Sequence, residues 1–75
     1  MGQTRSQQGR LTYHVEQDQQ GHWLVRQDGA DRSSSTHNSQ SDAIDEGKRL
    51  AENHRPSMLV SHDSNNNEDQ RNTYD

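Results

Sequence analysis

The sequence has no cysteine, no phenylalanine and a single proline among its 75 residues. Without cysteine the chain can form neither disulfides nor thiolate metal sites, and it has no cysteine nucleophile. Hydrophobic residues make up only 21% of the chain, and no apolar run approaches the roughly 18 residues of a membrane-spanning helix. The first ten residues also lack the apolar stretch of a signal peptide. These absences predict a small cytoplasmic protein whose core is held by packing alone.

The charge balance argues against nucleic-acid binding. Eight basic residues against twelve acidic residues give a net charge of -4, which repels the phosphate backbone of nucleic acids. The mean hydropathy of -1.62 shows that little apolar surface is available for a core. A chain of 75 residues forms one small domain at most, so large multidomain enzymes are excluded.

Apolar residues gather in the middle of the chain, between Leu11 and Val60. Residues 1–10 are rich in Gln, Ser and Arg and are expected to form a flexible arm. Residues 11–62 are predicted to form a single α+β domain. Residues 63–75 are polar and are expected either to add a short extra strand or to be disordered.

The first half of this domain has the alternating pattern of strands. From Leu11 to Val15, apolar and polar residues alternate, as in a strand with one buried face. Residues 22–27 are predicted to pair with this strand in a hairpin that buries Trp23 and leaves Leu24 pointing outward.

Two further strands are predicted on either side of a helix. The turn signal Asp28-Gly29 precedes a third, very polar strand over residues 30–36, whose polarity suits the edge of a sheet. Residues 58–62 are predicted to form a returning strand, with Leu59 pointing outward. The expected architecture is therefore a small antiparallel sheet of three strands, one packed helix and a returning strand.

The clearest element is a helix predicted over residues 40–54. Ser39 can accept a hydrogen bond from the first turn and Asp42 can bond back, which is a variant of the capping box. The residues at helical spacing on one stripe are Ala43, Ile44, Gly47, Leu50 and Ala51. The small residues among them let the helix approach the strands closely, opposite Trp23. Pro56 ends the helix, because proline disfavours the α conformation at the preceding residue.

Residues spaced along the whole domain also form a recognisable pattern. They are Tyr13-His14-Val15, Gly21, Trp23, Val25, Gly29-Ala30, Arg32, Ser34-Ser35, His37, Gln40, Ala43-Ile44, Leu50-Ala51, Leu59-Val60, His62 and Arg71-Asn72-Thr73-Tyr74. This pattern resembles a family of short bacterial proteins known only as a domain of unknown function. The resemblance implies a compact sheet with one packed helix, and it implies no activity. Family members carry a glycine-containing turn and a further apolar strand after position 62, where this chain has Asp63, Ser64 and three asparagines.

Five histidines raise the question of transition-metal binding, since imidazole is the commonest ligand of these metals. Their spacing does not fit a metal site. His14 and His22 could face one another across the hairpin, but no third ligand is spaced to complete the site. The histidines are therefore predicted to be surface residues, with His62 hydrogen-bonded at a strand end. We expect no metal and no cofactor.

A nucleophilic triad could be drawn from Asp31, His37 and one of the serines at positions 33–35. It is rejected because sequence neighbours on a strand alternate faces, and because no strained turn or glycine-rich oxyanion motif accompanies these residues. The serines are expected to make turn and ladder hydrogen bonds. We therefore expect no catalytic residues and no enzymatic activity.

Binding without catalysis is the function that these features favour. A marginal core, open sheet edges and outward apolar side chains favour a partner that covers them, either an unknown protein or a second copy in a weak homodimer. The candidate interaction surface consists of Leu24, Arg26, Arg32, Leu59, His62, Arg71 and Tyr74. The alternative is a nucleic-acid-binding module that uses Arg26, Arg32, Lys48, Arg49 and Arg55. Acidic residues interspersed among these cations weaken this alternative.

Overall fold

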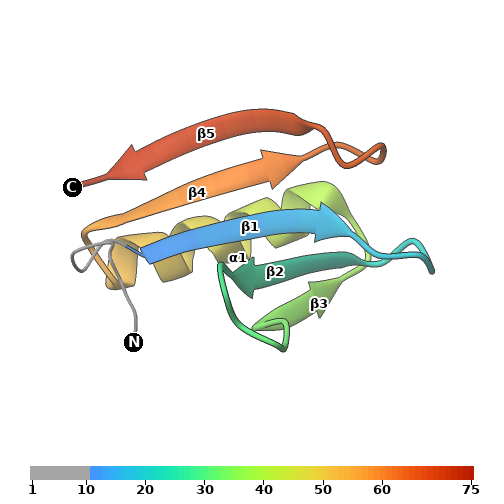
Figure 1. Cartoon of the computed structure of the whole chain (residues 1–75), viewed down its shortest axis with the longest axis horizontal. Helices are drawn as coiled ribbons and strands as arrows, with labels where there is room; N and C mark the ends of the chain where they lie inside the picture. Colours follow the sequence, from blue (N-terminus) through green and yellow to red (C-terminus); the bar gives the residue numbers. More distant parts are fainter. Residues whose placement is uncertain (1–10) are drawn as a thin grey trace.

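A computed structural model describes residues 11–75, so the predicted flexible arm of residues 1–10 lies outside the described residues. The elements are β1 (Leu11–Gln17), β2 (Trp23–Gln27), β3 (Ser35–His37), α1 (Gln40–Asn53), β4 (Ser57–His62) and β5 (Glu68–Tyr74). The strands form one sheet in the order β3-β2-β1-β4-β5 (Figure 1), in which β1 and β4 are parallel and the other neighbours are antiparallel. This arrangement confirms a small α+β fold.

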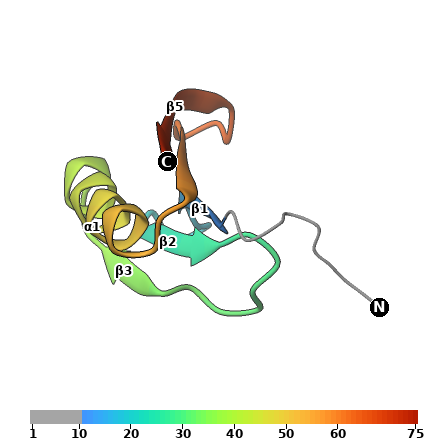
Figure 2. The same ribbon diagram turned by 90° about the vertical axis from the view of Figure 1, so that its left-hand side faces the viewer.

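Helix α1 covers one face of the sheet, as the view along the strands shows (Figure 2). Within residues 11–75 no other element covers the opposite face, which we call the open face. The helix has neither the length nor the apolar character needed to cross a membrane, and no other helix occurs in the described part of the chain.

The prediction of a three-stranded sheet is wrong, because the observed sheet has five strands and mixed directions. The predicted returning strand is β4, which lies beside β1 and parallel to it. The strand predicted over residues 30–36 shrinks to the three residues of β3. A turn closes at Ala30, whose N–H donates to the carbonyl of Gln27 at 2.9 Å, and the polar residues that follow have no apolar side chain to anchor a ladder.

The polar segment after β4 forms an extra strand, one of the two outcomes expected for it. Its turn is built on Asp63, whose Oδ1 accepts the backbone N–H groups of Asn65 at 2.9 Å and Asn67 at 3.0 Å. Asn66 adopts a φ of 70°, a conformation that asparagine tolerates better than most residues. Strand β5 then pairs antiparallel with β4, with a bulge between the partners of Ser61 and His62. Backbone hydrogen bonds to the buried strand β4 therefore hold β5 in the sheet, although β5 itself buries few side chains.

The predicted helix is confirmed to within one residue at its end. At its start, the backbone N–H of Asp42 donates to Oγ of Ser39 at 3.2 Å, which satisfies one of the unpaired first-turn donors. The predicted stripe faces the sheet, with Ala43, Gly47 and Ala51 buried. These small residues bring the helix axis close to the strands.

The core lies between the helix and the sheet. Its buried members are Tyr13, Val15, Val25, Ala43, Ala51 and Leu59, and its partly buried members are Leu11, Trp23, Ile44, Leu50 and Tyr74. The prediction that Leu59 points outward is wrong, since only 1% of it is exposed. In the parallel ladder Leu59 pairs with Tyr13, and paired residues share a face, so Leu59 turns toward the helix.

Candidate interaction surface

The open face is formed by the side chains that alternate with the core residues along each strand. They are Thr12, His14 and Glu16 from β1, Leu24 and Arg26 from β2, Met58, Val60 and His62 from β4, and Glu68, Arg71 and Thr73 from β5. The outward position predicted for Leu24 is confirmed, because it lies on the opposite face from the buried Val25. Val60 is only 4% exposed, so its polar neighbours shield it from solvent.

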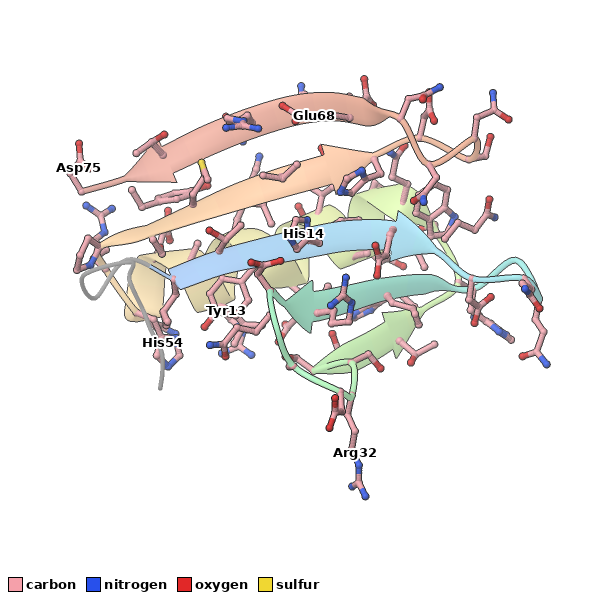
Figure 3. All side chains as sticks on the ribbon, in the orientation of Figure 1. Tyr13, His14, Arg32, His54, Glu68 and Asp75 are labelled. Carbon is pink, nitrogen blue, oxygen red and sulfur yellow. The ribbon has the colours of Figure 1, made fainter. Side chains whose placement is uncertain are left out.

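Two histidines from β1 and β4 stack at the centre of the open face (Figure 3 labels His14). The Nδ1 atom of His14 lies 3.2 Å from Nε2 of His62, and the ring centroids are 5.4 Å apart. The other ring nitrogen of His14, Nε2, lies 3.1 Å from Oδ1 of Asp28, which follows β2. These three side chains form a hydrogen-bonded row across β2, β1 and β4.

The carboxylate at one end of this row fixes the protons of the neutral rings. Asp28 only accepts, so Nε2 of His14 carries the hydrogen and its Nδ1 is left as an acceptor. The Nε2 of His62 must then donate to Nδ1 of His14. The remaining nitrogen, Nδ1 of His62, becomes an unprotonated acceptor, and it is buried without a hydrogen-bond partner in the described structure.

The structure does not bring together His14 and His22, which could have faced one another across the hairpin. His22 lies at the hairpin loop, where its backbone N–H donates to Oδ1 of Asp18 at 2.9 Å. The parallel pairing of β1 with β4 instead brings His62 to His14, and the predicted hydrogen bond of His62 at a strand end is confirmed. Across residues 11–75, no three His, Asp or Glu side chains are grouped so as to hold a metal ion.

An ion pair flanks the histidines on the β2 side. The Nε atom of Arg26 donates to Oε2 of Glu16 at 2.8 Å, and both side chains are less than one-third exposed, at 30% and 21%. This hydrogen bond lowers the pKa of Glu16 against the opposing effect of burial, and the positive charge of Arg26 lowers it further. The same bond raises the pKa of Arg26.

A second ion pair flanks the histidines on the β5 side. The guanidinium of Arg71 donates twice to Glu68, with Nε 3.0 Å from Oε2 and Nη2 2.8 Å from Oε1. This bidentate contact lowers the pKa of Glu68. The Nη1 atom of Arg71 also lies 3.9 Å from the sulfur of Met58, so the side chain extends over β4. Among the described residues, the open face therefore carries paired charges and no tryptophan or tyrosine.

The structure gathers only part of the predicted interaction surface. Four of its residues share the open face, namely Leu24, Arg26, His62 and Arg71. Leu59 belongs to the core, and Tyr74 turns to the helix side, where its ring lies 5.8 Å from the guanidinium carbon of Arg55. Arg32 projects from the loop between β2 and β3, away from the sheet (Figure 3).

The five cations of the nucleic-acid alternative do not converge. Arg26 lies on the open face, whereas Lys48 and Arg49 are exposed on the helix at the other side of the sheet. Arg49 is bound by Glu46, as Arg26 is by Glu16. A groove that tracks a nucleic-acid backbone needs neighbouring, available cations, and this arrangement does not supply them.

One candidate catalytic contact is present on β3. The Nε2 atom of His37 lies 2.8 Å from Oγ of Ser35, because residues two apart on a strand share a face. Within the described chain, no carboxylate is hydrogen-bonded to the second ring nitrogen of His37, and Asp31 lies outside β3 in an exposed bend. Ser35 and His37 therefore form a hydrogen-bonded pair that lacks the acidic residue which orients the histidine in a catalytic triad.

Strand β5 forms one edge of the sheet, and the short β3 forms the other (Figure 1). In the described structure β5 pairs with β4 alone, so the other side of its seven-residue backbone faces away from the sheet. The side chains from Glu68 to Arg71 are exposed. The sequence signal for this edge was the ending Arg71 to Tyr74, which the family pattern contains. The charged start of the strand gave no such signal.

Comparison with known protein families gives a match. A family model described as "Uncharacterized protein conserved in bacteria (DUF2188)" covers residues 13–74. No curated protein and no solved structure matches the chain significantly.

Proposed function

The chain belongs to the DUF2188 family of uncharacterised bacterial proteins, and we propose that it acts without catalysis by binding protein chains at the edge of strand β5. The observation that carries the proposal is the position of β5. It is a seven-residue strand at the end of the sheet order, with one backbone side paired to β4 and the other turned outward. An extended segment of another chain can add to such an edge through main-chain hydrogen bonds.

The composition of the rest of the molecule supports a binding role. Among residues 11–75, the main cluster of the core that the helix and sheet enclose has six buried apolar side chains. Domains of this size are marginally stable, so a partner that adds a strand to the sheet also stabilises the fold. The open face lies next to the β5 edge and adds polar contacts from Arg71 and Glu68 to any strand bound there.

Two features support binding over the competing classes of function. The Ser35 and His37 pair has no orienting acid among its hydrogen bonds in the described chain, and it lies at the opposite edge of the sheet from β5. The cations available for nucleic acid are separated by the sheet, and the net charge is -4. Protein binding needs neither a catalytic centre nor a cationic groove.

Site-specific photocrosslinking in the bacterial host tests the proposal. A photoreactive amino acid at the exposed Thr73 of β5 is compared with one at the exposed Lys48 of the helix. We expect protein crosslinks from position 73 and none of the same products from position 48. Identical products from both positions, or products from position 48 alone, would overturn binding at the β5 edge. Titration with labelled oligonucleotides at low salt checks the nucleic-acid alternative, which requires salt-dependent affinity.

A further inference from the structure

We propose that the partner at the β5 edge is a second copy of this chain, paired antiparallel about a two-fold axis at Gln70. The inference rests on the proposed function, because it names the strand that the β5 edge accepts. It would join two five-stranded sheets into one continuous sheet of two copies. Closed two-fold dimers, in which both copies use the same surface, are the commonest homo-oligomers.

The register follows from the charges along β5. A two-fold axis perpendicular to the sheet keeps both helices on the same side and centres the ladder on one residue. With the axis at Gln70, residue 69, which is the extra residue of the β5 bulge, lies opposite residue 71 of the second copy. Asp69 of each copy then lies opposite Arg71 of the other, which gives two cross-strand pairs of opposite charge.

The neighbouring registers lack this match. An axis at Arg71 places the two Arg71 side chains opposite each other. An axis at Asn72 places Asp69 opposite Asp75 of the second copy. Like charges directly opposite one another destabilise an antiparallel pair. Among these three registers, only the axis at Gln70 pairs charges of opposite sign.

The existing contacts of Arg71 are compatible with this pairing. Its side chain is 54% exposed although Nε and Nη2 bond Glu68 of the same strand. A guanidinium has five N–H donors in a planar fork, so one side chain can bond two carboxylates. In the paired sheet Arg71 would bridge its own Glu68 and the Asp69 of the second copy.

The same charges favour a second copy over an unrelated strand. Charged residues on an edge strand repel incoming strands that carry unmatched charges. The acidic and basic residues of β5 complement each other when the strand meets its own sequence in the opposite direction. The other edge, β3, has only three residues and offers a much shorter ladder.

Charge-swap variants test the inference by sedimentation from about 10 μM to about 1 mM. We expect the wild-type chain to show a mass that rises toward two copies with concentration. D69K and R71E each place like charges opposite one another, so we expect each alone to dissociate at least about tenfold more readily. An equimolar mixture of the two variants restores both opposite-charge pairs, and we expect its mass to exceed that of either variant alone.

K48E is the matched control, because it changes the net charge as R71E does but lies on the exposed helix surface. We expect it to associate like the wild type, and circular dichroism checks that every variant is folded. A wild-type chain that stays monomeric throughout, or a variant mixture no heavier than its components, would overturn self-pairing. Crosslinks from position 73 to a different protein would then still support the proposed function. If self-pairing fails and position 73 gives no such crosslinks either, both self-pairing and the proposed binding at the β5 edge are excluded.

Discussion

Gly47 of helix α1 lies against Leu59 of strand β4 so closely that a side chain at position 47 has no room. A Cβ atom there would lie 2.7 Å from Cδ1 of Leu59 and 3.4 Å from Cγ2 of Val15. Leu59 and Val15 are 1% and 0% exposed, so neither side chain can turn into solvent to make space. The absence of a side chain at Gly47 therefore sets the distance between the helix and the sheet.

We expect Gly47→Ala to lower the free energy of unfolding by about 1 kcal/mol, although alanine is the better helix former. Replacing glycine by alanine inside a helix gains about 1 kcal/mol of propensity, whereas overpacking a tight core costs about 1 to 3 kcal/mol. Urea denaturation followed by circular dichroism measures the net effect. Lys48→Ala, at an exposed neighbouring position, should change the stability by less than about 0.5 kcal/mol.

A double-mutant cycle identifies the cause of this loss. Leu59→Val removes the δ carbon atoms that a Cβ at position 47 would meet. In that background we expect Gly47→Ala to be neutral or stabilising, since the propensity gain remains and the closest contact is gone. An unchanged penalty in the Leu59→Val background would show that this contact is not the reason for glycine at position 47.

Truncating a side chain on one face of β2 should destabilise the protein more than truncating one on the other face. Trp23 packs against the core from a partly buried position, whereas Leu24 lies on the open face. We expect Trp23→Ala to lower the free energy of unfolding by about 2 to 4 kcal/mol, and Leu24→Ala by less than about 1 kcal/mol. Thermal denaturation of both variants measures the difference. Equal losses would contradict the assignment of the faces.

The helix and the first hairpin were predictable because their signals are local. Ser39 and the small-residue stripe predict the helix from spacing alone, and alternation from Leu11 to Val15 predicts β1. The position of β4 was not predictable in the same way. Its parallel pairing with β1 joins residues more than 40 positions apart, and that pairing turns Leu59 toward the helix instead of the solvent.

The candidate surface depends on the same long-range pairing. The stacking of His14 on His62 follows from the register of β1 and β4, and no spacing rule in the sequence reports it. Strand β5 has few apolar residues, so hydrophobic alternation could not distinguish an edge strand from a disordered tail. Its order comes from backbone pairing with β4 and from the turn built on Asp63.

The N-cap of the helix gives a smaller, local prediction. Ser39→Ala removes the oxygen that accepts the backbone N–H of Asp42, and we expect a loss of about 1 kcal/mol in the free energy of unfolding. Ser39→Asp should retain most of the stability, because aspartate also accepts this bond and suits the positive end of the helix dipole. Denaturation curves of both variants provide the test. Equal destabilisation by the two substitutions would argue against a capping role.

The ion pair between Glu16 and Arg26 makes the stability depend on pH in the acid range. The hydrogen bond from Arg26 lowers the pKa of Glu16 from its ordinary value of 4.5. A carboxyl group whose pKa is lower in the folded state binds its proton more readily in the unfolded chain. The stabilisation is therefore complete at pH values above 4.5 and is lost as the pH falls through the lower, folded-state pKa.

We expect Glu16→Gln to lower the free energy of unfolding by about 1 kcal/mol at neutral pH, since a charge-assisted hydrogen bond is replaced by a neutral one in a partly buried site. Below the folded-state pKa of Glu16 the wild type and the variant should converge, because the wild-type carboxyl is then protonated too. Urea denaturation at a series of pH values from neutral to strongly acid measures this convergence. Glu68→Gln is the control, because Glu68 makes a similar ion pair in a more exposed position, where solvent screens the charges. We therefore expect Glu68→Gln to change the free energy of unfolding much less than Glu16→Gln. A constant difference between Glu16→Gln and the wild type at all pH values would show that the lost stability does not come from the charge of Glu16.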